Sequence, residues 1–75
     1  MTIREHELVV LTADIPEEGL QKDDVGTVVM IHAAGRGFEV EFATLSGDTI
    51  AVVTVPAESL RPVAPNEIAH ARRVA

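Results

Sequence analysis

Five short apolar runs, each bounded by glycine, proline or acidic residues, constrain the fold of this chain more than any other feature. Valine is the commonest aliphatic residue, with 11 copies against five isoleucines and five leucines. β-Branched side chains suit a pleated strand better than a helix. The runs are therefore predicted to be strands at 7–12, 25–32, 38–42, 49–55 and 60–63. At 75 residues they make up one small all-β domain.

The third run shows which side chains face the core. Phe38, Val40 and Phe42 alternate with Glu39 and Glu41. A strand repeats every two residues, so the two phenylalanines and the valine are predicted to be buried and the two carboxylates to face water. The second and fourth runs are apolar on both faces, which predicts central, strongly bent strands shared between two layers.

The order of these elements predicts a barrel. A long loop, 14–24, follows the first strand, a three-strand meander comes next, and one 3₁₀ turn at 56–59 precedes the short last strand. Closing the sheet would protect its edges. We predict a five-stranded SH3-like barrel over residues 1–63, with another small β-barrel as the alternative. Gly26 interrupts a β-branched strand, which indicates a bulge, a sharp coil of the strand or a close backbone approach.

The C-terminal tail, 64–75, differs in character from the domain. Pro65 and Asn66 are typical of a helix start, so a short helix is predicted over part of the tail. A helix needs about 12–15 residues to be stable alone. The tail would be helical only if Ile68 and Val74 dock on another surface.

The charge balance restricts the partners. The chain has 12 acidic and 6 basic residues, a net charge of −6, and its one basic pair, Arg72 and Arg73, lies in the tail. Nucleic-acid binders neutralise phosphates with a basic surface, so binding to nucleic acid or to anionic lipid is disfavoured. An acidic surface fits a basic protein partner, or serves only solubility.

The sequence also predicts where the protein resides. The N-terminus lacks a basic start followed by an apolar stretch, and no apolar run exceeds four residues, whereas a membrane-spanning helix needs about 20. We therefore expect a soluble cytoplasmic protein.

The residue types that carry chemistry do not form a recognisable site. The chain has no cysteine, and His6, His32 and His70 lack zinc-ligand spacing. The acidic loop lacks the regular spacing of a calcium loop. Ser46 and Ser59 lie in turns without the setting of a nucleophile. We expect no catalytic residue, no metal site and no cofactor, and hence no enzyme.

Several segments together resemble a known family. They are Leu8-Val-Val-Leu-Thr-Ala-Asp-Ile-Pro16, Gly19-Leu-Gln-Lys-Asp-Asp-Val-Gly-Thr-Val-Val29, Phe38-Glu-Val-Glu-Phe42, Thr49-Ile-Ala-Val-Val-Thr-Val55 and Leu60-Arg-Pro-Val63. Over about residues 5–63 the chain resembles the domain-of-unknown-function family 4926. The resemblance implies a stand-alone bacterial domain, often encoded beside a larger gene as in toxin–antitoxin or immunity pairs. It supplies no catalytic residues.

Two classes of function follow. The first is an acidic, non-catalytic protein-binding module, such as an antitoxin or immunity-like partner of a neighbouring gene's product. The second is a structural or nucleic-acid-associated barrel of the ribosomal or transcription-factor type; a minor third is a domain that forms a homo-oligomer through exposed strand edges. Candidate contacts for the first class are acidic, with the last two included if they share the face of the loop: Asp14, Glu17, Glu18, Asp23, Asp24, Glu39 and Glu41.

Overall fold

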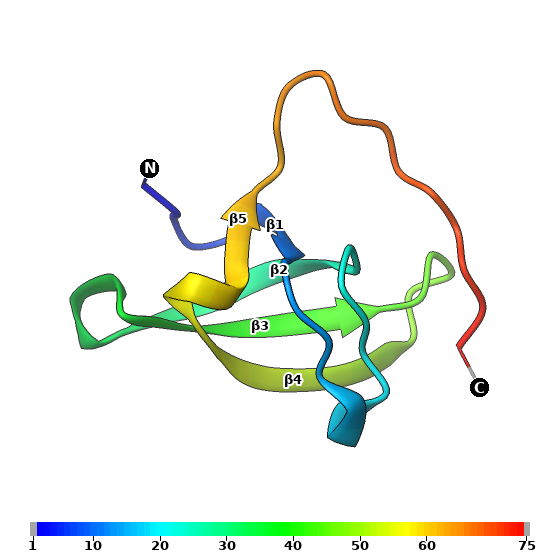
Figure 1. Ribbon diagram of the computed structural model, residues 1–75, viewed down its shortest axis with the longest axis horizontal. Helices are drawn as coiled ribbons and strands as arrows, with labels where there is room; N and C mark the ends of the chain where they lie inside the picture. The colour runs from blue at the N-terminus through cyan, green and yellow to red at the C-terminus, as the bar shows by residue number, and fades with distance from the viewer. Residues whose placement is uncertain (1, 75) are drawn as a thin grey trace.

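The protein folds as one antiparallel sheet of five strands. The computed structural model describes residues 2–74. The strands are β1 (Leu8–Leu11), β2 (Val25–His32), β3 (Gly37–Ala43), β4 (Thr49–Pro56) and β5 (Leu60–Pro62). Their order in the sheet is β4-β3-β2-β1-β5 (Figure 1). The all-β class and the five predicted strands are confirmed, because turn residues and apolar runs act locally on the backbone.

The sheet is strongly curved but does not close. Within residues 2–74, strands β4 and β5 are its two edges, and no ladder joins them. The short 3₁₀ turn η3 (Ala57–Ser59) carries the chain from β4 to the free side of β1, where Leu60 pairs with Leu11. The expectation of a closed barrel is thus corrected to an open, curved sheet, and the SH3-like description stays a prediction.

The expectation that the fourth strand is central is also wrong. Strand β4 pairs only with β3, and its Ile50 and Val52 side chains are 39% and 49% exposed. The apolar side chains of this strand lie on both of its faces. One face packs on the core, and the other remains partly in solvent. Strand β2, by contrast, is the third strand of five and is central as predicted.

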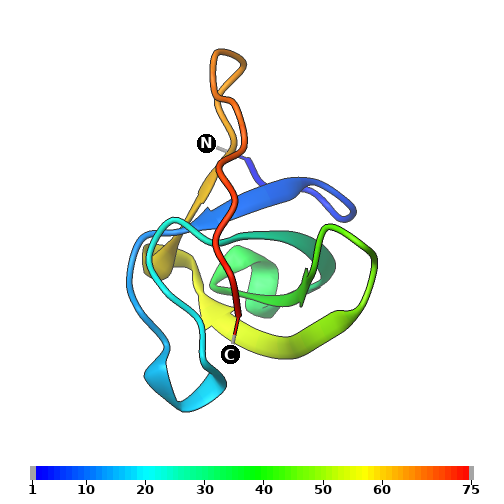
Figure 2. The same cartoon turned by 90° about the vertical axis from the view of Figure 1, so that its right-hand side faces the viewer.

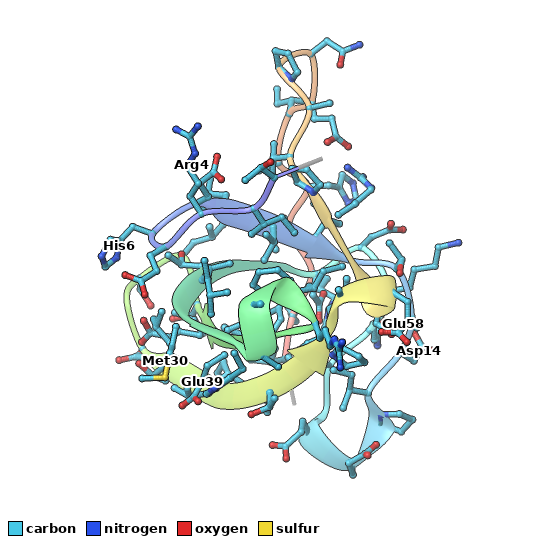
Figure 3. The ribbon with its side chains drawn as sticks, turned by 90° about the vertical axis from the view of Figure 1, so that its left-hand side faces the viewer. Arg4, His6, Asp14, Met30, Glu39 and Glu58 are labelled. Atoms are coloured by element: carbon cyan, nitrogen blue, oxygen red, sulfur yellow. The ribbon has the colours of Figure 1, made fainter. Side chains whose placement is uncertain are left out.

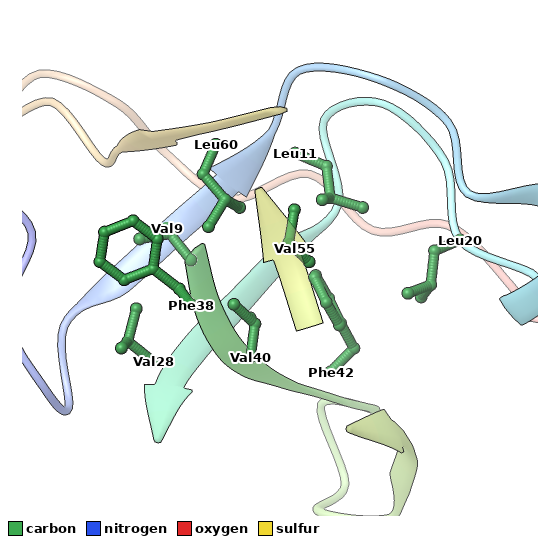
Figure 4. Close-up of a cluster of buried hydrophobic side chains, with 9 residues drawn as sticks. All are labelled: Val9, Leu11, Leu20, Val28, Phe38, Val40, Phe42, Val55 and Leu60. Carbon is green, nitrogen blue, oxygen red and sulfur yellow. The ribbon is translucent and has the colours of Figure 1, made fainter. Parts of the chain in front are cut away.

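The core lies inside the curve of the sheet (Figure 4). It consists of nine buried apolar side chains: Val9, Leu11, Leu20, Val28, Phe38, Val40, Phe42, Val55 and Leu60. The predicted inward positions of β3 are confirmed, since Phe38, Val40 and Phe42 are at most 4% exposed. Glu39 and Glu41 lie on the opposite face and are half-buried.

Gly26 is a site of close backbone approach, which is one of the three roles predicted for it. A Cβ atom at this position would lie 2.5 Å from Val40 Cγ1 and 2.9 Å from the Glu41 carbonyl oxygen. The bulge, another of these roles, lies further along β2, where the pairing with β3 shifts between Val28 and Met30. Only glycine lets β2 cross the β3 side chains at this distance.

Two further 3₁₀ turns lie within residues 2–74; the sequence indicated a turn at 33–37 but not its 3₁₀ form, and it did not indicate the other. Turn η1 (Pro16–Glu18) ends at Gly19, whose φ is +69°, and η2 (Ala33–Gly35) connects β2 to β3. The turn predicted before the last strand is η3. A single turn has too few residues for a periodic sequence signal.

The tail is not helical, which corrects the prediction for residues 64–75. Residues 64–74 contain no helix, and residue 75 lies outside the described residues. The docking that the helix needed is missing, because Ile68 is 94% exposed and Val74 is 40% exposed. The chain instead runs in an extended path away from β5 and back across one end of the sheet (Figure 2).

No helix within residues 2–74 is long and apolar enough to cross a membrane.

Candidate interaction surface

The acidic loop, residues 14–24, is an ordered excursion between β1 and β2. Leu11 closes its base, since its N–H donates to the Asp24 carbonyl at 2.9 Å and its carbonyl accepts from the Asp23 N–H at 2.8 Å. An isolated bridge joins Ile15 to Leu20 near its tip. Leu20 is buried in the core and anchors the loop to the sheet. The loop therefore presents its carboxylates from a hydrogen-bonded backbone.

Two of the five loop carboxylates accept hydrogen bonds from backbone N–H groups of the same loop. Asp14 Oδ1 accepts the Lys22 backbone N–H at 2.7 Å, and Asp24 Oδ2 accepts the Gln21 backbone N–H at 2.8 Å. Glu17 and Glu18 lie on turn η1 and are exposed, as is Asp23. Among residues 2–74, none of these last three forms an ion pair. They are the loop charges available to another molecule.

Asp24 binds the guanidinium of Arg72. The sequence pattern did not predict this contact. Arg72 Nε donates to Asp24 Oδ1 at 2.7 Å, and Arg72 Nη2 donates both to Asp24 Oδ2 at 2.6 Å and to the Gly19 carbonyl at 3.1 Å. The left-handed conformation of Gly19 occurs at the C-terminal end of η1, on the same loop. One carboxylate and one carbonyl thus form a seat for an arginine.

The electrostatics of this seat favour the ionised pair. The hydrogen bonds from Arg72 are the main cause that lowers the pKa of Asp24, and partial burial of the carboxyl opposes them. The same interaction raises the pKa of Arg72. The Asp24 side chain is only 15% exposed and that of Arg72 30% exposed, so this contact is better shielded from water than an ordinary surface pair.

A second arginine–carboxylate pair lies where the tail leaves the sheet. Arg61 Nη1 and Nη2 each donate to one oxygen of Glu67 at 2.7 Å, and Glu67 Oε1 also accepts the Ala64 backbone N–H at 2.7 Å. These contacts lower the pKa of Glu67 to about 2, with Arg61 as the larger cause. The tail is thus held by one side-chain pair at each end.

Between these two pairs the tail is one wall of a cavity of about 890 Å³, which we call the tail groove. The other walls come from the sheet and its loops and include Leu8, Val10, Val25, Phe42 and Ile50. Charged side chains of both signs also line it: Lys22, Asp23, Asp24, Arg61, Glu67 and Arg72. A concave surface that combines apolar side chains with a few polar groups is typical of a binding site.

The structure does not bring Glu39 together with the acidic loop. Glu39 and Asp14 lie on opposite sides of the molecule (Figure 3). Glu39 Oε1 is 3.1 Å from His32 Nε2, and Glu41 Oε2 accepts the Thr49 hydroxyl at 2.6 Å. The two β3 carboxylates therefore serve contacts between neighbouring strands and turns, and the condition for including Glu39 in the candidate surface is not met.

The histidines and the turn serines singled out in the sequence lie as follows. Within residues 2–74, no three or more histidine, aspartate or glutamate side chains meet in a group that could hold a metal ion. The Ser46 hydroxyl lies 3.1 Å from the Thr44 hydroxyl inside a turn. In the sequence, Arg72 is recognisable only as one half of the basic pair Arg72-Arg73. Its opposite charge to the Asp23–Asp24 pair was the only signal that could have linked the two segments.

Comparison with known proteins identifies the family. No curated protein and no solved structure matched the chain. The model of the domain of unknown function DUF4926 matches residues 5–62, which are most of the chain and include all five strands and the whole acidic loop. The family predicted from the segment pattern is confirmed, and the chain belongs to DUF4926.

Proposed function

We propose that this chain is a small, acidic, non-catalytic protein-binding module whose partner presents a basic surface. The observation that carries the proposal is the acidic loop, which exposes the carboxylates of Glu17, Glu18 and Asp23. Of these three, Asp23 also lines the tail groove. The net charge of −6 gives the whole molecule the same sign as this loop. Charges at the rim of a binding surface mainly accelerate encounter with an oppositely charged partner.

An antitoxin- or immunity-like role is the finer form of this proposal. Such a protein masks the basic surface of a nuclease-like partner, and an acidic loop on a rigid sheet suits that task. The loop has its own backbone hydrogen bonds and a buried anchor at Leu20. Little ordering would therefore be needed on binding, which favours affinity.

The test starts with capture of partners from the native host at low salt, with the full-length protein as bait. The association rate of the captured protein is then measured as salt is raised. We expect one basic partner, and slower association with Glu17→Gln/Glu18→Gln than with the wild type. The dissociation rate should change less, because exposed rim charges act mainly on encounter.

The matched control is Glu5→Gln/Glu39→Gln, which removes the same two charges. Glu5 belongs to the segment of Arg4 and His6, which are labelled with Glu39 on the side of the molecule away from Asp14 (Figure 3). Equal association rates for the two double variants would contradict a role for the loop. Tight, salt-resistant binding of the wild type to DNA or RNA would contradict the proposed partner class.

Strand β4 supports self-association as a second candidate function. It is eight residues long, and within residues 2–74 its outer edge pairs with no strand. Ile50 and Val52 on this strand are partly exposed. Long exposed edges are templates for pairing with another chain. A sedimentation experiment that finds only monomer up to millimolar concentration would exclude this function.

A further inference from the structure

The tail is held against the sheet and loop only by side chains. Residues 65–74 are all exposed. Beyond Ala64, and among the described residues, the tail forms no backbone–backbone hydrogen bond with the sheet or the loop. Arg72 is its distal attachment, 48 residues away in sequence from its partner Asp24. Beyond the Arg61–Glu67 pair at its base, the described part of the tail is held by Arg72 alone, so its distal part can open locally without breaking any backbone hydrogen bond to the sheet or the loop.

The seat for Arg72 does not depend on the tail for its shape. Asp24 is oriented by the Gln21 N–H at 2.8 Å, and the Gly19 carbonyl is set by the end of η1. The loop base is closed by the two hydrogen bonds of Leu11. Every one of these contacts lies within residues 11–24. The seat would therefore persist when the tail leaves.

We propose that the seat formed by Asp24 and Gly19 binds an arginine of an extended segment of another protein, that the sheet residues lining the tail groove contact the rest of that segment, and that the chain's own Arg72 occupies the seat until the segment displaces it. The inference rests on the proposed protein-binding function and names its site and the chemistry of its partner. The tail acts as an internal competitor. The apparent association constant for the partner segment equals the constant for the open site multiplied by the fraction of molecules in which the site is open.

The chemistry of the seat selects arginine over lysine. Arg72 uses Nε and Nη2 on the two carboxylate oxygens and a second Nη2 hydrogen on the Gly19 carbonyl. A planar guanidinium presents these donors in one fixed arrangement, whereas an ammonium group cannot match the bidentate geometry. The site should therefore distinguish two residues of equal charge.

Charge complementarity favours another protein over a second copy of this chain. A second copy would bring the same net charge of −6, and repulsion between two molecules of like net charge slows association. A basic segment of another protein is attracted by this net charge and, once Arg72 has left, by the carboxylate of Asp24.

The test uses the full-length protein and a fluorescent peptide with the sequence of residues 66–74, followed by anisotropy. We expect Arg72→Gln to bind the peptide about fivefold more tightly than the wild type, since the resident arginine no longer competes; this corresponds to roughly 1 kcal/mol. The matched control is Arg73→Gln. It removes the same charge from the next residue, whose side chain forms no ion pair within residues 2–74, and should bind like the wild type.

Substitutions in the peptide test the seat without any change to the protein. A peptide with glutamine in place of Arg72 should bind Arg72→Gln at least tenfold more weakly than the unmodified peptide, and one with lysine there should also bind more weakly. In the protein, the added change Asp24→Asn should remove the gain seen with Arg72→Gln, with circular dichroism as the check on folding.

Three results would overturn the proposal. One is equal affinity of Arg72→Gln and Arg73→Gln for the peptide. Another is equal binding of the arginine and glutamine peptides. The third is a concentration-dependent dimer of the wild type that Arg72→Gln abolishes in sedimentation, which would make a second copy the occupant. The peptide experiment needs no native partner, so its outcome is separate from success or failure in capturing one.

Discussion

Replacement of Gly26 by alanine should destabilise the fold strongly, because the added methyl group has no space. Its carbon would lie 2.5 Å from Val40 Cγ1, 2.8 Å from Phe42 Cε1 and 2.9 Å from the Glu41 carbonyl oxygen. Carbon atoms in normal contact are about 3.5–4.0 Å apart. Val40 and Phe42 are both core residues, and the carbonyl belongs to the backbone of the adjacent strand, so none of the three can move without disturbing the sheet.

The expected cost follows from what overpacking does in other cores. Forcing an extra methyl group into a packed core costs about 1–3 kcal/mol, and the backbone contact places Gly26→Ala at the upper end. Alanine also restricts the conformations of the unfolded chain, which offsets the loss by stabilising the fold by roughly 0.4–1 kcal/mol. The net loss should be about 2 kcal/mol. A domain of this size has only about 3–5 kcal/mol in total.

Urea unfolding followed by circular dichroism measures this loss. With a slope of about 1 kcal/mol per molar urea, the midpoint should fall by about 2 M. Gly37→Ala is the matched control, because it changes a glycine in the neighbouring strand whose added carbon would meet only the Val55 carbonyl, at 3.8 Å. Its midpoint should stay close to that of the wild type. Equal midpoints for the two variants would refute the steric reasoning.

Three further predictions concern the core, the tail and pH. Phe42→Ala removes a core ring that is 3% exposed and should cost about 3–5 kcal/mol, so an unchanged urea midpoint would contradict the core assignment. A chain ended at residue 64 should keep its β-type circular dichroism and melt within a few degrees of full length, since the tail buries no side chain and its two ion pairs are partly exposed and therefore contribute little to stability; loss of folding would contradict this. The pKa of Glu67 is lowered from 4.5 to about 2, so the stability that its ionised form contributes is present above pH 4.5 and is lost as the pH falls toward 2. An NMR titration of its carboxyl group should show a higher pKa in Arg61→Gln than in the wild type, and equal values would exclude Arg61 as the main cause.

The position of each strand could be predicted from the sequence, because strand formation here depends on local signals. Alternation on β3 placed Phe38, Val40 and Phe42 in the core, and glycine or proline residues marked the turns between runs. A period of two and the conformational preferences of turn residues need no knowledge of distant contacts. The family was also visible in the segment pattern, and the matching family model covers residues 5–62.

The tertiary structure decided which strands are edges and which charges meet. Both faces of β4 are apolar, yet it is an edge strand, because sequence pattern does not record how many neighbours a strand has. The acidic loop was predicted from the acidic, proline and glycine residues between two apolar runs, whereas the arginine seat required Asp24, Gly19 and Arg72 to come together. Their sequence separations of 48 and 53 residues carry no periodic signal, and only the path of the folded chain brings them within hydrogen-bonding distance. The tail is extended rather than helical for the same physical reason: so short a helix needs a surface on which to dock, and whether that surface exists is a property of the whole fold.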